Sequence, residues 1–235
     1  MTLYLHEVHR VVGHAEDAFE AAFRDPDGWM QRLGEGDDAR LLWYLNQAHG
    51  AGPSYRVVTL TAVADGAAWE RLARRIHDGD LRQLAHRTDA LRHDVTAKVL
   101  MPVEWSPLIE LDLSSVAAVP ADHPQSLYME DTMWPERGKL DQYLAGAASH
   151  YAPLIGQPGS LLDLSLALVG AIGAGTRPEV VLMQKVRDAD RLIRLLATEI
   201  PAERRAPGTW MHDALVWRDQ WRSSLLRSST WSPWA

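Results

Sequence analysis

The tripeptide Trp105-Ser106-Pro107 recurs as Trp231-Ser232-Pro233, 126 residues later, and this match is a clear sign of how the chain is organised. A second match lies near the start of the chain. There Leu3-Tyr4-Leu5, in a β-rich run, has a counterpart in Leu127-Tyr128-Met129, 124 residues further on. Self-similarity at a nearly constant period indicates repeated structural units. The sequence therefore predicts that one fold unit occurs twice.

Three further matches fall between these in the same order. They pair Gly50-Ala51-Gly52 with Gly173-Ala174-Gly175, Val57-Val58 with Val180-Val181, and Asp65 with Asp188, each at an offset of 123 residues. We expect an N-terminal unit over residues 1–110 and a C-terminal unit over residues 126–235. The segment 111–125 carries Ser114-Ser115, Pro120 and Pro124, a composition typical of a linker.

The composition is that of a globular protein and excludes several classes. With 235 residues, 46% of them hydrophobic and 23% charged, the chain is long enough to bury a core, which excludes global disorder. The absence of cysteine excludes a disulfide scaffold, a thiolate nucleophile and zinc–cysteine sites. A net charge of −7 argues against a general nucleic-acid binder, which needs clustered basic residues to neutralise phosphates.

Each copy reads as strand, helix, strand, strand, helix, strand. In the first copy the patterns cover 2–11, 15–33, 40–48, 55–64, 66–76 and 94–102, with a second short helix over 81–91. In the second copy we expect strands over 126–134, 161–172, 178–186 and 223–229, and helices over 139–151, 189–200 and 209–220. This order is typical of the ferredoxin-like arrangement, so the predicted fold class is α+β.

A ferredoxin-like sheet carries both helices on one face and leaves the other face apolar and in need of cover. Two copies in one chain can cover each other. We therefore expect two tandem βαββαβ units that form an intramolecular dimeric α/β barrel, with a ligand cavity between the sheets.

The end of the first copy, Val99-Leu100-Met101-Pro102-Val103-Glu104-Trp105-Ser106-Pro107-Leu108, resembles the closing strand of NIPSNAP-family domains. The strand at Leu127-Tyr128, with Gly138-Lys139-Leu140 leading into a helix, is similar to the family's first strand and helix start. The first copy departs from this pattern, because Gly13-His14 stands where the family has Gly-Lys, and the second copy lacks a proline before Gly138. The resemblance implies a dimeric α/β-barrel protein with a central pocket, whose members range from cofactor-free monooxygenases and cyclases to haem enzymes.

Strand alternation selects the candidate catalytic residues. If Leu3 and Leu5 face the helices, then Tyr4 and His6 face the barrel interior. In the same way, Leu127 and Met129 on the helix side turn Tyr128, Glu130 and Thr132 inward. A histidine facing a carboxylate is a plausible acid–base pair, so His6 and Glu130 are the candidate catalytic residues. The alternatives are a structural ion pair, or a bulge that reverses the alternation.

The candidate substrate-binding residues are the aromatic and polar side chains that share these faces: Tyr4, Tyr128, Thr132, Tyr44 and Asn46. Tyr44 and Asn46 share one face of their strand, and the sequence leaves open whether that face lines the cavity. The apolar 161–172 strand predicts a hydrophobic ligand.

The histidines do not predict a metal site. His6 and His9 are three residues apart on a strand, so they face opposite sides and cannot ligate one metal together. His150 is the best-placed haem ligand if the chain binds haem, although nothing in the sequence specifies haem. We expect no cofactor and no metal. Phosphate-binding loops, zinc-protease motifs and nucleophile elbows are absent from the sequence.

The sequence thus favours a barrel enzyme that acts on a small hydrophobic, carbonyl-bearing or polyketide-like metabolite, as in natural product biosynthesis. The chemistry would be proton transfer, leading to cyclisation, isomerisation or cofactor-free oxygenation. The alternatives are a binding or interaction protein of the NIPSNAP type without turnover, and a haem-binding barrel protein. We expect a cytoplasmic protein, without nucleic-acid or membrane partners, that could form a homodimer of the two-unit chain.

Overall fold

A computed structural model describes residues 1–173, 175 and 177–234. Contacts divide the chain into two compact units, which we call the first and the second unit. The first comprises Met1–Met101, Glu110–Ser126 and Leu225–Ala235, and the second comprises Pro102–Ile109 and Leu127–Ser224. The repeated glycine motif includes Ala174, and the predicted C-terminal unit ends at Ala235; both residues lie outside the described part of the chain.

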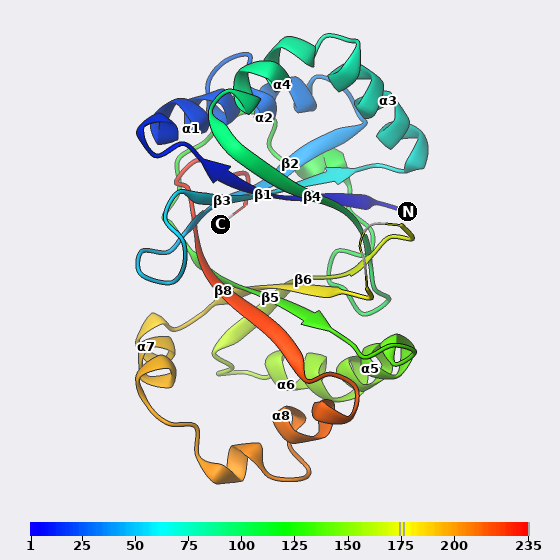
Figure 1. The fold of residues 1–235 in the computed structure, drawn as a ribbon, viewed down its shortest axis with the longest axis vertical. Helices are drawn as coiled ribbons and strands as arrows, with labels where there is room; N and C mark the ends of the chain where they lie inside the picture. Colours follow the sequence, from blue (N-terminus) through cyan, green and yellow to red (C-terminus); the bar gives the residue numbers. More distant parts are fainter. Residues whose placement is uncertain (174, 176, 235) are drawn as a thin grey trace. The chain divides into compact units, whose positions relative to one another are not determined.

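The first unit folds as an antiparallel sheet with helices on one face (Figure 1). Its elements are β1 (Leu3–Val11), α1 (Glu16–Arg24), α2 (Trp29–Gly34), β2 (Ala39–Gln47), β3 (Arg56–Val63), α3 (Gly66–His77), α4 (Arg82–Asp89) and β4 (Arg92–Pro102), with short 3₁₀ turns at Gly13–Ala15 and Leu113–Ser115. Strand β1 pairs with β3 and β4, and β2 pairs with β3, which gives the order β4-β1-β3-β2.

The second unit repeats this plan. Its elements are β5 (Leu127–Trp134), α5 (Leu140–Gly146), α6 (Ala152–Ile155), β6 (Leu162–Gly170), β7 (Val180–Val186), α7 (Ala189–Ala197), α8 (Trp210–Asp213) and β8 (Gln220–Ser228), with a π-helical turn at Ala147–Tyr151 and 3₁₀ turns at Ala202–Arg205 and Ala214–Val216. The strand order is β8-β5-β7-β6, the same order as in the first unit. The predicted fold class, α+β with two tandem ferredoxin-like units of the dimeric α/β-barrel kind, is confirmed.

The serines of the two Trp-Ser-Pro motifs make equivalent hydrogen bonds. The hydroxyl of Ser106 accepts a hydrogen bond from the Ala167 amide at 3.0 Å, and the hydroxyl of Ser232 accepts one from the Tyr44 amide at 3.1 Å. Each motif thus caps an amide of the second strand of the unit with which it packs. For this reason the last residues of the chain belong to the first unit, whereas the sequence-based division placed them in 126–235.

The segment 111–125, which the sequence predicts to be a linker, also packs with the first unit. Leu113 and Val116 are buried, and the Asp112 side chain accepts a hydrogen bond from the Ser114 amide at 2.9 Å, which holds the turn. The helix predicted over 15–33 is interrupted after Arg24 and resumes as α2, because Pro26 cannot continue a helix and Asp27 adopts a left-handed backbone with φ of 63°.

Two hydrophobic cores hold the helices on their sheets. In the first unit, Phe19 and Phe23 of α1 pack against Tyr44 of β2, with ring centroids 6.4 Å and 5.3 Å from the Tyr44 ring. In the second unit, Trp210 and Trp217 lie 6.2 Å apart and join the core, so the predicted packing of these tryptophans is confirmed. The helix predicted over 209–220 is shorter than expected, because the chain returns to the sheet where the Glu136 amide binds the Trp217 carbonyl at 2.8 Å.

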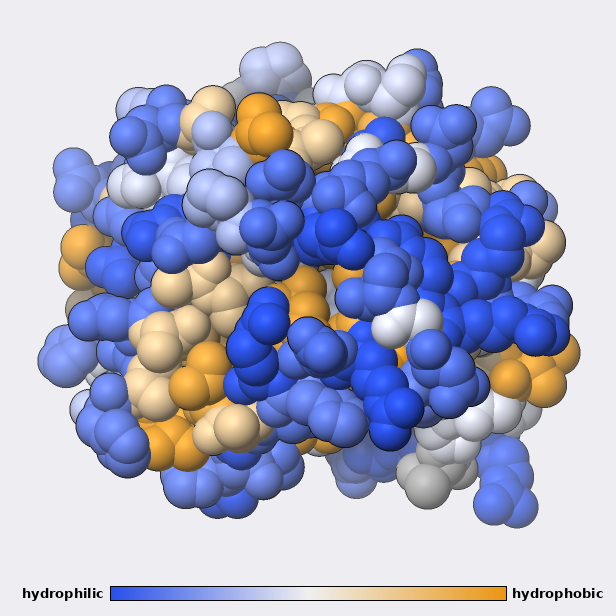
Figure 2. All heavy atoms as spheres, turned by 90° about the horizontal axis from the view of Figure 1, so that it is seen from above, coloured by the Kyte–Doolittle hydropathy of each residue, from blue (hydrophilic) through white to orange (hydrophobic). Residues whose placement is uncertain are grey.

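The outer face over the first unit's helices is mostly hydrophilic, with hydrophobic patches between the hydrophilic residues (Figure 2). Among the described residues, no helix combines the length and the apolar character that crossing a membrane requires.

Candidate functional site

A cavity of about 140 Å³ lies between the sheet and the helices of the first unit. Its lining is mainly apolar and comes from β1, β3, β4 and all four helices: Leu5, Phe23, Trp29, Leu33, Leu72, Ile76 and Ala85, together with the polar side chains of Glu7, His9, Thr61, Thr88, Asp89 and Arg92. A small number of polar groups converging on an apolar cavity is the usual character of a ligand site.

Two residues of β1 bring ionisable groups to the apolar side of the sheet. Strand alternation places Leu5, Glu7 and His9 on one face, and all three line the cavity. The His9 ring is buried against α1, with its centroid 5.1 Å from that of Phe19 and 5.9 Å from that of Phe23. A histidine and a glutamate in such surroundings need polar partners, because buried polar groups without hydrogen bonds are strongly destabilising.

The partners of His9 fix its tautomer. Arg92 Nη1 lies 2.7 Å from His9 Nδ1, and because a guanidinium can only donate, Nδ1 must accept and carry no proton. The proton of the neutral ring is therefore on Nε2, which donates to the Thr59 hydroxyl at 2.9 Å. Burial, with the neighbouring Arg92 charge, lowers the pKa of His9 to about 3. His9 is thus a neutral donor at physiological pH, with no lone pair available for base catalysis.

The hydrogen-bond chain ends at Glu7. Since the Thr59 oxygen accepts from His9, its own proton is free to donate to Glu7 Oε2, at a distance of 3.4 Å. The direction of donation is therefore from Arg92 to His9, then to Thr59, then to Glu7. At the far end, Arg92 Nε donates to Asp89 Oδ1 at 3.0 Å, which orients the guanidinium. Glu7 is the group through which this series of hydrogen bonds reaches the cavity.

Burial raises the pKa of Glu7, while the Arg92 charge and the Thr59 hydroxyl lower it in part. A carboxyl group with a raised pKa is a stronger proton acceptor when ionised and stays protonated to a higher pH than a solvated one. A raised pKa of this kind suits a group that takes a proton from a substrate and returns it.

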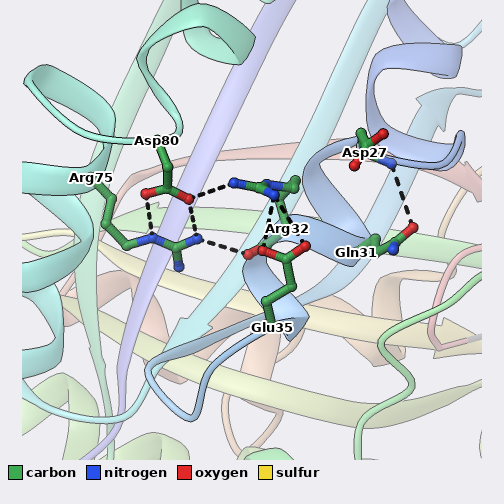
Figure 3. Close-up of polar contacts among 6 residues, drawn as sticks. All are labelled: Asp27, Gln31, Arg32, Glu35, Arg75 and Asp80. Carbon is green, nitrogen blue, oxygen red and sulfur yellow. Dashed lines mark hydrogen bonds and ion pairs between the residues drawn. The ribbon is translucent and has the colours of Figure 1, made fainter.

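The helices above the cavity are tied together at their ends. Trp29 Nε1 donates to the Thr88 hydroxyl at 2.8 Å, which links α2 to α4. Close by, Asp80 accepts hydrogen bonds from Arg32 of α2 at 2.7 Å and from Arg75 of α3 at 2.8 Å (Figure 3). The hydrogen bond from Arg75 lowers the pKa of Asp80 to about 2. These contacts hold the helical side of the cavity in place.

The residues that the sequence selected in the first unit lie on two faces. Tyr4 and His6 are buried on the face of β1 opposite to Glu7 and His9, as the alternation argument predicts. Tyr44 instead lies on the helix side, in the core with Phe19 and Phe23, which answers the question the sequence left open for its strand. Asn46 shares that face, and its side chain donates to the Ser229 hydroxyl at 3.1 Å.

In the second unit, Tyr128, Glu130 and Thr132 alternate along β5 and are all buried. They lie on the face opposite to Met133, which packs in the helix-side core. The predicted parity is therefore observed within each unit. The pairing of His6 with Glu130 joins residues of different units and stays a prediction.

Asp131 is the second unit's counterpart of Glu7, 124 residues later and on the same side of its sheet. Both of its oxygens have donors: Ser223 Oγ donates to Oδ1 at 2.5 Å and Gln184 Nε2 donates to Oδ2 at 2.8 Å. The Gln184 carbonyl oxygen in turn accepts from the Tyr151 hydroxyl. Burial raises the pKa of Asp131, but its hydrogen bonds are already made within the protein.

His150 lies in the π-helical turn that brings Tyr151 to this network. The His150 Nδ1 lies 3.2 Å from the Gly146 carbonyl oxygen and 2.8 Å from the Ser149 hydroxyl. The side chain lines an open groove of about 700 Å³ with Trp210 and Arg204. Within the described residues, no three histidine, aspartate or glutamate side chains gather as a metal site would require.

None of the protein-family models matches the sequence, and a search of curated proteins finds no similar sequence. Solved structures share the fold over the whole chain. A proposed monooxygenase from Lactobacillus acidophilus is 5% identical, with a TM-score of 0.59, over 100% of this chain and 97% of that protein. An anthrone oxidase-like protein is 8% identical, with a TM-score of 0.57, over 97% of this chain and 91% of that protein.

A NIPSNAP family protein from Agrobacterium tumefaciens is also similar, at 19% identity and a TM-score of 0.38. The match covers 46% of this chain and 99% of that protein. The similarity to the two full-length structures, at 5% and 8% identity, establishes the fold and no chemistry.

The sequence carries a signal for the helix-side site in the alternation of β1. The alternation that turned Tyr4 and His6 away from the helices also placed Glu7 and His9 among Leu3 and Leu5 on the apolar side. Ionisable residues at predicted core positions indicate a functional or structural network. The contributions of Thr59 and Arg92 come from distant strands, and the sequence alone does not align them with Glu7.

Proposed function

We propose that the protein is an enzyme that moves a proton on a small, mainly apolar carbonyl compound, with Glu7 as the acid–base catalyst. The observation that supports this most directly is the hydrogen-bond chain from Arg92 through His9 and Thr59, which ends on a carboxyl group at the wall of an apolar cavity. The full-length likeness to proteins named as proposed monooxygenases is consistent with an enzyme of this fold.

The size of the cavity limits the substrate. An apolar cavity of about 150 Å³ in another protein holds one benzene molecule. The cavity here is of similar size, about 140 Å³, and its walls include Phe23, Trp29 and Ile76. The substrate, or the part of it that enters, is therefore about one six-membered ring in size, with one polar group directed toward Glu7.

The chemistry follows from the protonation states. Ionised Glu7 takes a proton from the carbon next to the carbonyl, the electron pair of that C–H bond moves to the carbonyl oxygen, and an enolate forms. Where the substrate is a β,γ-unsaturated ketone, the proton then returns from Glu7 to the γ-carbon and the double bond moves into conjugation, which completes an isomerisation with no change in redox state. The Thr59 hydroxyl stabilises the ionised carboxylate, and the fixed Nε2–H tautomer of His9 orients that hydroxyl.

Two other outcomes start from the same enolate. Attack on a second carbonyl of the substrate would give a cyclisation, and reaction with dissolved O₂ as the oxidant would give an oxygenation. A protein that only binds its ligand would hold the same ring against Glu7 without exchanging its protons. Product analysis with and without O₂ separates these outcomes.

The test measures deuterium uptake. We expect the protein to accelerate exchange of the α-protons of single-ring ketones, such as cyclohexanone and acetophenone, in D₂O, followed by NMR. Glu7→Gln should lower the rate by about a hundredfold or more, the usual scale of lost acid–base catalysis. Ligand affinity should change little, because glutamine keeps the size and polarity of the side chain.

The matched control is Asp131→Asn, the same chemical change at the counterpart position in the second unit. It should leave the exchange rate unchanged. Exchange by the Glu7→Gln variant at the wild-type rate would overturn the proposal, and binding without any exchange in the wild type would leave the protein as a binding protein.

A further inference from the structure

Arg218 is a buried cation in the second unit, between the Ala214–Val216 turn and β8. The residue is only 7% exposed, and its Nε and Nη1 atoms have no hydrogen-bond partner among the described residues, although the guanidinium donates a hydrogen bond to the Tyr143 hydroxyl. The guanidinium is held over the Trp221 ring at 4.5 Å, and the Arg218 amide binds the Ala214 carbonyl at 3.0 Å. A buried guanidinium with unmade hydrogen bonds is unfavourable unless an anion supplies them.

The repeat shows that Arg218 is the counterpart of Arg92. The Trp-Ser-Pro motifs set an offset of 126 residues for this part of the chain, which relates residue 92 to residue 218. The backbone agrees: the Val12 amide binds the carbonyl of Leu91 at 3.0 Å, and the Glu136 amide binds the carbonyl of Trp217 at 2.8 Å. The two arginines therefore follow equivalent residues, Arg92 as the first residue of β4 and Arg218 two residues before β8.

The partners of the two arginines differ. Arg92 is satisfied by Asp89 and His9. The corresponding positions in the second unit hold Leu215 and Met133, neither of which can accept an ionic hydrogen bond. Asp131, the counterpart of Glu7, directs its oxygens to Ser223 and Gln184 instead. The second unit thus keeps the cation and lacks both of the groups that accept its hydrogen bonds in the first unit.

We propose that Arg218 is the centre of an anion-binding site that takes a small carboxylate, free or as part of a larger ligand. The planar guanidinium matches a carboxylate in geometry. A single positive charge, with the Asp131 carboxyl group close enough to influence Tyr143 and Arg218, favours a singly charged anion over a phosphate dianion. The Tyr143 hydroxyl oxygen accepts a hydrogen bond from the guanidinium, and its own proton is a second donor for the bound oxygen.

The experiment compares thermal unfolding in sodium acetate and in sodium chloride at equal ionic strength, with sodium phosphate as a third arm. A ligand that binds only the folded state raises Tm, so acetate at about a hundredfold excess over its Kd should raise Tm by about 5 °C or more. Phosphate should raise Tm less than acetate.

Variants separate specific binding from a general salt effect. Arg218→Met should remove the acetate-dependent rise and unfold in chloride at the wild-type Tm or above it, because an unsatisfied charge is gone. Leu215→Asp, which restores the carboxylate that Asp89 supplies to Arg92, should also remove the acetate effect. In contrast, Arg92→Met should lower Tm and keep the acetate-dependent rise.

The proposal is overturned if the wild-type Tm is the same in acetate and chloride, or if Arg218→Met responds to acetate as the wild type does. A rise in phosphate that equals or exceeds the rise in acetate would overturn the assignment to a carboxylate. Failure of Arg218→Met to fold would show that Arg218 is satisfied within the protein, and would also contradict the proposal.

Discussion

The two units carry a carboxyl group at equivalent positions, Glu7 and Asp131, but surround it with different hydrogen-bond partners. Glu7 has one long hydrogen bond, from Thr59 at 3.4 Å, and borders a cavity. Asp131 has a donor on each oxygen, from Ser223 at 2.5 Å and Gln184 at 2.8 Å. The backbone frame is the same, so the difference comes from the partners. A reactive carboxyl group and a structural one can therefore arise at equivalent positions of one fold.

The strand register shows which substitutions make the difference. Glu7 lies opposite Thr59 across β1 and β3, whereas Asp131 lies opposite Leu182 across β5 and β7. Two residues along, Thr61 in the first unit corresponds to Gln184, whose longer side chain reaches Asp131. In the second unit the hydrogen-bond donor to the carboxyl group of Asp131 therefore lies at a different position of the strand, and Asp131 has its partners within the protein.

The helices differ as well. In the first unit α1 ends at Arg24, and Phe23 lines the cavity. In the second unit a π-helical turn follows α5 and carries Tyr151, whose hydroxyl joins the Gln184–Asp131 network. A π-turn inserts an extra residue into a helix and rotates the side chains that follow, which accounts for a tyrosine at this point.

The largest expected effect concerns activity at the two carboxyl positions. Glu7→Gln should lower proton-exchange activity by about a hundredfold or more, whereas Asp131→Asn should leave it unchanged and destabilise the fold by about 1–3 kcal/mol, because its hydrogen bonds with Ser223 and Gln184 are disturbed. Exchange kinetics and urea unfolding measure the two effects.

Glu7→Gln should also stabilise the protein near neutral pH. The folded-state pKa of Glu7 is raised, so the folded state holds this proton more tightly than the unfolded state, and stability falls as pH rises through the titration range. Glutamine does not ionise, so the variant does not lose this stability as pH rises. A variant that is both inactive and less stable at pH 7 would contradict the reactive assignment.

The second effect is a sensitivity to acid that His9 gives to the first unit. The pKa of His9 is about 3 in the folded state, below the value of about 6.5 for an unperturbed histidine, so the unfolded state takes up the proton first. Stability should therefore fall as pH decreases from about 6.5 toward 3, by a few kcal/mol.

His9→Gln, which can still accept from Arg92 and donate to Thr59, should lose much less stability over that range. The counterpart position holds Met133 and contributes nothing of this kind. His49→Gln, at an exposed histidine, is the control and should follow the wild type. Parallel denaturant curves for wild type and His9→Gln at all pH values would show that His9 titrates normally.

The third effect concerns the packing of α5, which differs from that of α1. Gly146 of α5 lies against Trp217, and a Cβ atom there would come within 2.5 Å of the indole ring. The counterpart in α1 is Ala22, which already carries a Cβ. Gly146→Ala should destabilise the protein by about 1–3 kcal/mol despite the better helix propensity of alanine. A gain in stability, measured by Tm, would show that Trp217 moves aside freely.

The smallest effect concerns the ion pairs at the ends of the first unit's helices. Asp80→Asn should cost less than about 1 kcal/mol, because its partners Arg32 and Arg75 are partly exposed and solvent screens such pairs. The pKa of Asp80 is about 2, so the stabilisation is present above its usual pKa and is lost as pH falls toward 2. A loss that is unchanged at 1 M salt would contradict a screened ion pair.

The sequence predicts the topology well because repeats and strand alternation are local patterns. The repeated Trp-Ser-Pro motif is sufficient to predict two equivalent units. The alternation in Leu3-Tyr4-Leu5 is sufficient to predict on which side of the sheet His6 and His9 lie. The alternation does not predict that Pro102–Ile109 packs with the second unit and that the last residues of the chain pack with the first. These placements depend on the contacts of Ser106 and Ser232, which join residues that are far apart in sequence.

The candidate site is predicted only in part. The sequence directs attention to His6 and Glu130, because polar residues on the open face of a sheet suggest a cavity. It does not reveal that Arg92 fixes the tautomer of His9, since that contact spans 83 residues and depends on the register of β1 and β4. Whether Tyr44 faces the helices depends on the bulge between Leu41 and Trp43, which shifts the alternation in β2.

The most direct test is a crystal structure of the protein with cyclohexanone or acetophenone bound. We expect electron density for one ring in the cavity of the first unit, between Phe23 and Ile76, with the carbon next to the carbonyl within reach of a Glu7 oxygen. Density instead on the other face of β1, against Tyr4 and His6, with the helix-side cavity empty, would contradict it.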